Sequence, residues 1–432
     1  MFFPARRLLS AATLLAGLFA GLPGSIAPAA AADAASAEVE RGRYLARVAN
    51  CVACHTREGG KPFAGGLPIR TEAGTLYSTN ITPDVTTGIG GYTLAEFDRA
   101  VRQGVARDGR RLYPAMPYPS YARMRAEDIA ALYAYMRASV VPVTQRNTDA
   151  QMHWPYSMRS LLIVWNALYV SGSPVRTDAA KDAAWNRGAY VVQAVAHCGA
   201  CHTPRGWLYG EKGLDERSKR FLSGASVEGW SATNLTGDQI TGLGAWSRAE
   251  IAEFLRTGRN AHATSFGPMS TVISTATQYM TPADLDAVAA YLKSLPGARG
   301  ETRPFQHDTS TAPSLLQGRY DSPGARQYSQ FCMPCHGADG KGFARVFPPL
   351  AGNPTVADPN PASLVNLLLN GAVTARINTA PTDYHMPGYG WTLDNQELAN
   401  VLTFIRGSWG NRAAPVSEAD VAARRRQLEA TR

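Results

Sequence analysis

Apolar side chains recur with helical spacing at three places far apart in the 432-residue chain. In each place they occupy positions i, i+3, i+4 and i+7, which lie on one face of an α-helix. The three stripes are Ile129, Leu132, Tyr133 and Met136, then Leu285, Val288, Ala289 and Leu292, and finally Leu398, Val401, Leu402 and Ile405. A capping Thr281 and a first-turn Pro282 precede the second stripe. The pattern predicts a buried helix that closes each of three similar units.

Two further patterns repeat with the stripes. A segment predicted to be a helix leads into each unit, over residues 42–51, 188–198 and 324–332. Units one and two also share a polar block, Thr79-Asn80-Ile81-Thr82 and Thr233-Asn234-Leu235-Thr236, which the third unit lacks. Repetition at a spacing of about 130 residues is typical of tandem domains. We therefore predict domains at 36–145, 178–298 and 318–412, linkers at 146–177 and 299–317, and a polar tail at 413–432.

All six cysteines of the chain fall in three copies of the pentapeptide C-x-x-C-H. The copies are Cys51, Cys54 and His55, then Cys198, Cys201 and His202, and finally Cys332, Cys335 and His336. This pentapeptide is the attachment site of c-type haem, in which the thiols form thioethers and the next imidazole binds the iron. Three copies with no spare cysteine predict three covalently bound haems and an electron carrier.

Other uses of paired cysteines fit this sequence less well. A zinc ribbon needs two pairs about 15–20 residues apart, which is far closer than the pairs here. A thioredoxin-type pair belongs in a βαβ unit and does not require a histidine after it. Disulfides within the pairs would leave three histidines in the same position unexplained.

A methionine flanked by proline or glycine follows each haem motif. Thioether ligation opposite a histidine raises the reduction potential and leaves no open iron site for oxygen. The repeated position predicts Met116, Met269 and Met386 as the distal iron ligands. Next to Met386, His385 stays open as an alternative that would give a bis-imidazole haem. Four histidines have no repeated counterpart and are expected to be surface or structural: His153, His197, His262 and His307.

The first 32 residues have the pattern of a secretory signal peptide. Arg6 and Arg7 precede an apolar run over 8–20, which is too short to span a bilayer, and small residues lead to a predicted cleavage before Asp33. Because bacteria attach c-type haem after export, this pattern predicts a periplasmic protein. Without the two signal arginines the formal charge falls from +9 to +7. The haem propionates would offset most of that, so the composition does not favour a nucleic-acid partner.

Several blocks outside the haem motifs carry a more specific signal. They include Tyr77–Pro83, Arg107–Gly109, Tyr113–Pro117, Trp185–Gly188 and Thr403–Asn411. With the haem motifs, they resemble the triheme cytochrome c subunits of membrane-bound alcohol, gluconate, sorbitol and fructose dehydrogenases. The resemblance covers nearly the whole mature chain and implies an all-α fold of three tandem cytochrome c domains, each with one haem.

The resemblance also implies a role. A large quinoprotein or flavoprotein subunit would oxidise an alcohol, sugar or aldehyde at the periplasmic face of the inner membrane, with a small third subunit allowed for. This chain would pass the electrons to ubiquinone and would have no catalytic residue for the organic substrate. A free periplasmic multihaem carrier or an oxidase-docking cytochrome stays open, because the same ligands would serve it. A haem peroxidase would need an iron with a vacant or labile site.

Attachment to the membrane is expected to be peripheral or through a partner. The longest apolar stretch after the signal, Leu161–Val170, has ten residues with Asn166 inside and is too short to span. It fits an interfacial helix, a docking surface for the dehydrogenase, or a linker helix packed on the first domain, with the last two together favoured. The basic run Arg424–Arg426 offers only weak attraction to anionic lipid.

Overall fold

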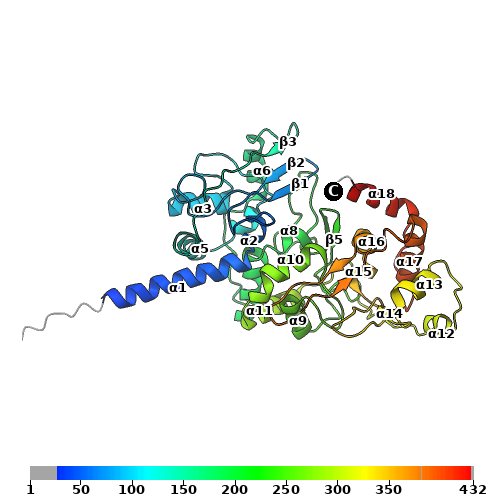
Figure 1. Ribbon diagram of the computed structural model, residues 1–432. Helices are drawn as coiled ribbons and strands as arrows, with labels where there is room; N and C mark the ends of the chain where they lie inside the picture. The colour runs from blue at the N-terminus through cyan, green and yellow to red at the C-terminus, as the bar shows by residue number, and fades with distance from the viewer. Residues whose placement is uncertain (1–26, 381, 430–432) are drawn as a thin grey trace, which may run out of the picture. The chain divides into compact units, whose positions relative to one another are not determined.

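The computed structural model describes residues 27–380 and 382–429 (Figure 1). The described residues from Glu38 onward form one compact unit, whereas residues up to Ala37 belong to a separate one. Helix α1 (Ala27–Val48) runs through the predicted cleavage point before Asp33. The predicted apolar run of the signal peptide lies outside the described residues. We refer to the parts of the chain in the three predicted domain ranges as repeats 1, 2 and 3.

Repeat 1 and the linker after it combine helices with one small sheet. The helices are α1, α2 (Cys51–Cys54), α3 (Leu94–Gln103), α4 (Tyr118–Tyr121), α5 (Ala126–Ala138) and, in the linker, α6 (Leu161–Tyr169). The antiparallel sheet has the order β1-β2-β3, from β1 (Pro68–Thr71), β2 (Gly74–Tyr77) and β3 (Gln151–Met152). Its register pairs Pro68 with Tyr77 and Thr75 with Gln151. The sheet therefore fixes the start of the linker onto repeat 1.

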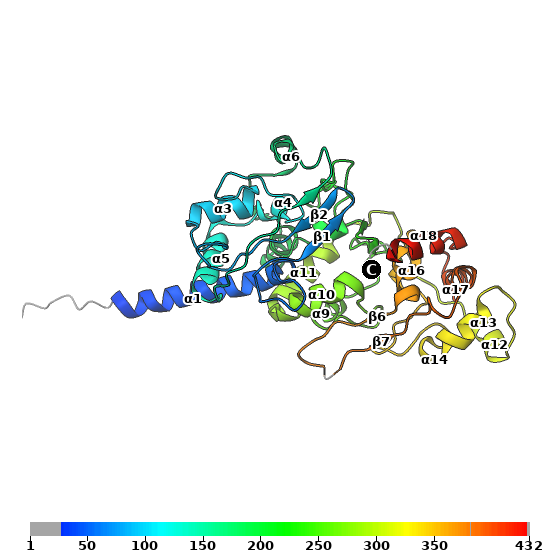
Figure 2. The same cartoon turned by 45° about the horizontal axis from the view of Figure 1, so that its top comes forward.

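Repeat 2 follows the same order of elements. It contains α7 (Ala183–Tyr190), the π-helix η1 (Val191–Val195), α8 (Gly199–His202), β4 (Ala225–Val227), β5 (Trp230–Ala232), α9 (Arg248–Thr257), α10 (Gly267–Thr275), the 3-10 helix η2 (Thr277–Tyr279) and α11 (Pro282–Ser294). Strands β4 and β5 pair antiparallel, with Ala225 opposite Ala232. Figure 2 shows α10 between α9 and strand β6 of repeat 3, both of which it contacts.

Repeat 3 is helical apart from one short strand pair. Its elements, with the linker helix α12 before them, are α12 (Thr311–Leu316), α13 (Ala325–Gln327), the π-helix η3 (Tyr328–Cys332), α14 (Met333–His336), α15 (Pro354–Ala357), α16 (Ala362–Asn370), β6 (Ala372–Val373), β7 (His385–Met386), α17 (Asn395–Gly407) and α18 (Glu418–Glu429). Across the described residues the fold is helix-rich, and the three sheets found there are small. Among residues 27–380 and 382–429, every helix is too short or too polar to cross a bilayer.

The three predicted stripes form helices α5, α11 and α17, and their apolar residues are buried except for the half-buried Tyr133. The predicted cap of α11 is also present, because the Thr281 side chain accepts a hydrogen bond from the backbone N–H of Asp284 at 3.1 Å. Helices α3 and α9 each begin with a capping box, at Thr93 and Ser247. Such boxes satisfy backbone donors at both ends of the motif. The local pattern therefore fixes where these helices begin.

A glycine lets each haem-motif segment cross its stripe helix at backbone contact. An added Cβ would lie 1.8 Å from the Ala131 carbonyl oxygen at Gly42, 2.0 Å from that of Ala287 at Gly188, and 2.2 Å from that of Asn400 at Gly324. Any larger side chain would force these helices apart. Figure 1 shows one such pair, α13 and α17 of repeat 3. In all three repeats, the close packing of the two helices therefore requires a glycine at this position.

The hydrophobic core is divided unequally among the repeats. One continuous cluster spans repeats 1 and 2, and it includes Met124, Ile129, Val191, Val195 and Tyr291. Repeat 3 has a separate cluster. Helix α18 contributes to that cluster through Val421, so the predicted tail packs against α17. A third, small cluster joins α10 to repeat 3. Repeats 1 and 2 are therefore one packed body, to which repeat 3 adds a core of its own.

Candidate haem-binding sites

Each C-x-x-C-H motif forms a single helical turn at the end of the segment that leads into its repeat. In repeats 1 and 2 the residue before the first cysteine has a left-handed backbone, with φ of 53° at Asn50 and 42° at His197. This conformation is uncommon outside glycine and ends the preceding helix. In repeat 3 the π-helix η3 instead continues through Cys332. Such π-helical turns occur most often at functional sites.

The three motif histidines make the same hydrogen bond. The Nδ1 atom lies 2.7 Å from the Thr79 carbonyl oxygen in His55, 2.7 Å from that of Thr233 in His202, and 2.9 Å from that of Pro348 in His336. Because a carbonyl oxygen only accepts, Nδ1 must carry the hydrogen and donate it. The unprotonated nitrogen is then Nε2, the atom that binds a metal in this tautomer. The backbone therefore holds all three rings in the tautomer that a metal-binding imidazole needs.

The electrostatic surroundings favour neutral groups at these positions. Burial lowers the pKa of His55, His202 and His336, more than the hydrogen bonds to carbonyl oxygens raise it. Burial raises the pKa of the first cysteine in each motif, Cys51, Cys198 and Cys332, to about 12. A thiolate is therefore disfavoured there, whereas a thioether carries no charge. Neutral imidazole and neutral thioether sulfur are the forms that c-type haem uses.

The predicted distal methionines are all half-buried, in three different settings. Met116 lies in the loop before α4 and packs, with Cys51, around the core shared by repeats 1 and 2. Met386 lies in β7 and packs, with Cys332, around the core of repeat 3. Met269 lies in α10 and packs with Ile273 and the repeat 3 residues Ala375 and Ile377. Two of the three methionines thus join the cluster that holds their own motif.

His385 and Met386 are neighbours on a strand, where successive side chains point to opposite faces. Met386 is half-buried against the core of repeat 3, whereas His385 is exposed. Within the strand pair, Met386 lies opposite Ala372 and His385 opposite Val373. The burial of these two residues favours Met386 over His385 as the side chain on the core side.

The haem motifs of repeats 1 and 2 lie against each other. The Ala49 carbonyl oxygen is 3.2 Å from His197 Nε2 and accepts a hydrogen bond from the Tyr121 hydroxyl at 3.1 Å. The Tyr121 and His197 rings also meet edge to face, 5.6 Å apart between centroids. Thr275 of α10 donates to the Asn50 side chain at 2.7 Å. His197 therefore has the structural role that the sequence left open, as part of a junction between two haem motifs.

The carbonyl partners of the histidines were not predicted. Thr79 and Thr233 lie in the repeated polar block, so the repetition marked the right segment without showing that its backbone would be used. Repeat 3 has no such block, and only the fold brings Pro348 to His336. In all three repeats the cysteine pairs, the histidine tautomer and the burial fit a covalently attached c-type haem.

Fold and sites together define a c-type cytochrome with three haem-attachment motifs. A family model described as Cytochrome c matches residues 39–139, 186–296 and 322–409, one segment within each predicted domain. The chain is 49% identical over 414 residues to the alcohol dehydrogenase (quinone) cytochrome c subunit of Gluconacetobacter polyoxogenes, with 95% of this chain and 88% of the relative covered. It therefore belongs to the cytochrome c family and, within it, to the cytochrome c subunits of sugar and alcohol dehydrogenases.

Two further relatives show the same extent of similarity. The gluconate 2-dehydrogenase cytochrome c subunit of Pantoea cypripedii is 45% identical over 421 residues, which cover 96% of both chains. The alcohol dehydrogenase (quinone) cytochrome c subunit of Gluconobacter oxydans is 43% identical over 404 residues, covering 92% of this chain and 84% of the relative. The family resemblance seen in the sequence blocks is thus confirmed over nearly the full length.

Proposed function

We propose that this chain is the electron-relay subunit of a dehydrogenase complex. A large quinoprotein or flavoprotein subunit oxidises an alcohol, sugar or aldehyde, and this chain carries the electrons to ubiquinone. The observation that carries the proposal is the sequence identity of 43–49% to dehydrogenase cytochrome c subunits across more than nine-tenths of the chain. Similarity confined to the haem motifs would equally suit a free carrier, whereas this similarity extends through the linkers as well.

The proposed relay uses three haem sites that share the same types of ligand. Each pair of cysteines, at 51 and 54, 198 and 201, and 332 and 335, would hold one haem through thioethers. His55, His202 and His336, oriented by their carbonyl acceptors, would bind the iron, and Met116, Met269 and Met386 would supply the second protein ligand. When bound, haem supplies one-electron exchange at the iron. The residues of the chain fix the imidazole tautomer and keep the first cysteine of each motif half-buried.

In this proposal the complex lies on the periplasmic face of the inner membrane. This chain reaches the periplasm by export through its predicted signal peptide. Peripheral contact or a partner subunit holds this chain there. The organic substrate is bound and oxidised in the partner, so this chain is assigned no catalytic residue of its own.

The proposal is tested on the complex purified gently from its native membranes. Alcohols, aldoses, sugar acids and aldehydes are added in turn while the haem α-band is followed. A co-purifying large dehydrogenase and substrate-driven haem reduction are expected, with reoxidation on addition of a short-chain ubiquinone analogue. A tertiary alcohol serves as a control, because it has no hydrogen on the carbinol carbon to give up. A single chain reduced only by small chemical donors would instead support the free periplasmic carrier.

A further inference from the structure

Helix α6, in the linker after repeat 1, presents most of its apolar side chains to solvent. The exposed fractions are 48% for Leu161, 54% for Ile163, 61% for Val164 and 63% for Leu168. Leu161, Val164 and Leu168 are spaced i, i+3 and i+7 and therefore share one face of the helix. The helix packs on repeat 1 through its other side, so this face stays uncovered. Here only Leu162 and Asn166 of the helix are buried.

The opposite side of α6 is fixed to the body of the protein. Asn166 accepts a hydrogen bond from the Tyr118 hydroxyl at 2.8 Å and donates to the Gln103 carbonyl oxygen at 3.0 Å. Trp165 donates from Nε1 to the Leu208 carbonyl oxygen of repeat 2 at 2.8 Å. These buried and half-buried contacts hold the helix in one orientation. The packing of the opposite side therefore directs the apolar face of α6 toward solvent.

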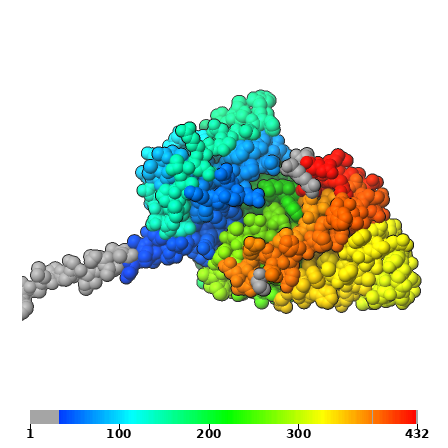
Figure 3. All heavy atoms as spheres, viewed as in Figure 1, coloured from blue at the N-terminus to red at the C-terminus, as the bar shows by residue number. Residues whose placement is uncertain are grey.

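Two exposed tryptophans belong to the same region. Trp154 is 79% exposed and Trp207 is 87% exposed. They stand two residues before Tyr156 and Tyr209, whose rings meet edge to face 6.4 Å apart between centroids. We call Trp154, Leu161, Val164, Leu168 and Trp207 the α6 surface. Figures 2 and 3 show α6 projecting at the outer edge of the body formed by repeats 1 and 2. Tryptophan beside aliphatic side chains is typical of proteins at the membrane–water interface.

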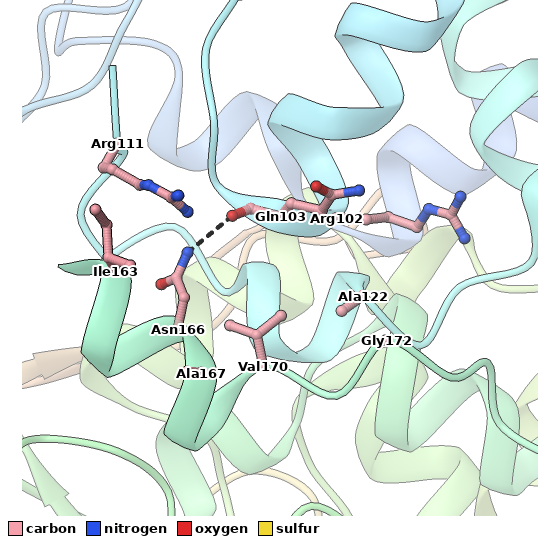
Figure 4. Close-up of a pocket in the computed structure, with 9 residues that line it drawn as sticks. All are labelled: Arg102, Gln103, Arg111, Ala122, Ile163, Asn166, Ala167, Val170 and Gly172. Atoms are coloured by element: carbon pink, nitrogen blue, oxygen red, sulfur yellow. Dashed lines mark hydrogen bonds between the residues drawn. The ribbon is translucent and has the colours of Figure 1, made fainter. Parts of the chain in front are cut away.

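A cationic pocket adjoins this surface. It has a volume of about 390 Å³, and Arg102, Arg111, Ile163, Asn166 and Val170 are among the residues that line it (Figure 4). Arg102 forms an ion pair with Asp98 at 2.6 Å, but its Nε atom is buried without a hydrogen-bond partner. Arg111 has no carboxylate partner among the described residues. Figure 4 shows the side chains of Arg102 and Arg111 extending in opposite directions, so within the described residues it is Arg111 that offers an unpaired positive charge beside the exposed side chain of Ile163.

We propose that the α6 surface inserts into the membrane interface and that Arg111, in the adjoining pocket, binds the phosphate of an anionic phospholipid. One lipid molecule supplies both groups that would cover this region: acyl chains for the exposed aliphatic side chains and a phosphate for the Arg111 guanidinium. Docking through one short helix and two tryptophans gives peripheral attachment that is apolar as well as electrostatic. The inference rests on the proposed function, because delivery of electrons to ubiquinone requires the cytochrome to lie at the membrane surface.

The test measures co-flotation of the purified full-length holoprotein with vesicles. The vesicles contain phosphatidylcholine alone or phosphatidylcholine mixed with phosphatidylglycerol, and the wild-type chain is expected to bind the mixed vesicles more tightly. Replacing Leu161, Val164 and Leu168 by serine is expected to weaken binding to both compositions about tenfold or more. R111Q is expected to weaken binding about fivefold on mixed vesicles only. Because these side chains are exposed or line a pocket, the haem content and visible spectrum should be unchanged.

Two matched variants serve as controls. W391S removes a tryptophan of repeat 3 that is 87% exposed, and R303Q removes an exposed arginine before repeat 3. Both should bind vesicles like the wild-type chain. Equal loss in the controls and the α6 variants would overturn the proposal, as would α6 variants that bind vesicles normally. α6 variants that keep vesicle binding but lose the co-purifying dehydrogenase would assign the surface to a protein partner and also overturn it.

The membrane proposal and the electron-relay function are tested by different measurements, so each can be overturned without the other. Substrate-driven haem reduction is measured in detergent solution, where no vesicle is needed. Normal reduction with absent vesicle binding overturns only the membrane proposal, whereas normal vesicle binding without substrate-driven reduction overturns only the relay function.

Discussion

Tyr44 of repeat 1 donates a hydrogen bond to Asp284 of repeat 2 at 2.5 Å, and Tyr190 of repeat 2 donates the equivalent bond back to Asp128 of repeat 1. The two tyrosines hold the same position in their repeats, two residues after Gly42 and Gly188. Each carboxylate also pairs with an arginine of its own repeat, Asp284 with Arg187 and Asp128 with Arg41. The contact is therefore reciprocal, as in the isologous interface of a two-fold dimer.

This reciprocity predicts a specific loss of stability. Y44F and Y190F each remove one hydrogen bond to a charged carboxylate, which typically contributes about 1.5–3 kcal/mol. We expect each variant to lower the free energy of unfolding by that amount, measured by urea titration of the holoprotein. Y320F is the control, since Tyr320 is exposed and its hydroxyl meets the Ser329 hydroxyl at 3.3 Å, while the ring that Arg326 covers is kept in the variant. An effect of Y320F as large as those of the two junction variants would contradict the assignment.

The same pair predicts how stability changes with pH. Burial and the bond to Asp284 raise the pKa of Tyr44 to about 12. The folded-state pKa thus lies above the unfolded value of about 10, so the contribution is complete below pH 10 and is lost as pH rises toward 12. Burial raises the pKa of Asp284, but hydrogen bonds from Arg187 and Tyr44 outweigh it and lower the value overall. That contribution is present above about pH 4 and is lost as pH falls further.

The measurement compares the urea midpoints of unfolding of wild type and Y44F over the acidic and the alkaline pH range. The difference between the two proteins should shrink between pH 10 and 12 and again below pH 4. Because the variant keeps every haem ligand, changes at the irons cancel in this comparison. A constant difference across the whole range would show that the Tyr44 contact does not titrate with folding.

The division of the core predicts unequal effects of removing a haem. Replacing Cys332 and Cys335 together by alanine should lower the pyridine haemochrome count from three haems per chain to two, because repeat 3 has its own core. Replacing Cys198 and Cys201 should also lower the yield of folded chain, because repeats 1 and 2 share one core. The readouts are haem per chain and the amount of soluble holoprotein. Equal yields for the two double variants would argue against the shared core.

The burial of Met386 and the exposure of His385 predict which side chain completes the third iron site. M386A should remove one of three contributions to the near-infrared methionine-to-iron charge-transfer band and allow carbon monoxide to bind the reduced protein at one haem. H385A should leave the band and the carbon monoxide response unchanged. A full band in M386A together with a changed spectrum in H385A would assign the ligand to the histidine.

The sequence by itself determined the features that depend on neighbours along the chain. The helical stripes at 129–136, 285–292 and 398–405, the cap at Thr281 and the three C-x-x-C-H motifs each depend on residues a few positions apart, so spacing was enough to predict them. The blocks around these motifs also identified the family, because they are long and occur in order. The ligand types follow from the pentapeptide, since thiols and imidazole are the groups that c-type haem requires.

Tertiary structure decided what depends on residues far apart in the chain. Three similar units predicted three tandem domains, and the structure adds that repeats 1 and 2 share a core and exchange Tyr–Asp bonds, whereas repeat 3 has its own core. Pro348 reaches His336 through a loop that no repeated block marks. Helix α6 is apolar in sequence, but only packing shows that Asn166 turns inward and the aliphatic face outward. Local spacing fixes an element and its faces, while the partner of each face is fixed by contacts that spacing does not encode.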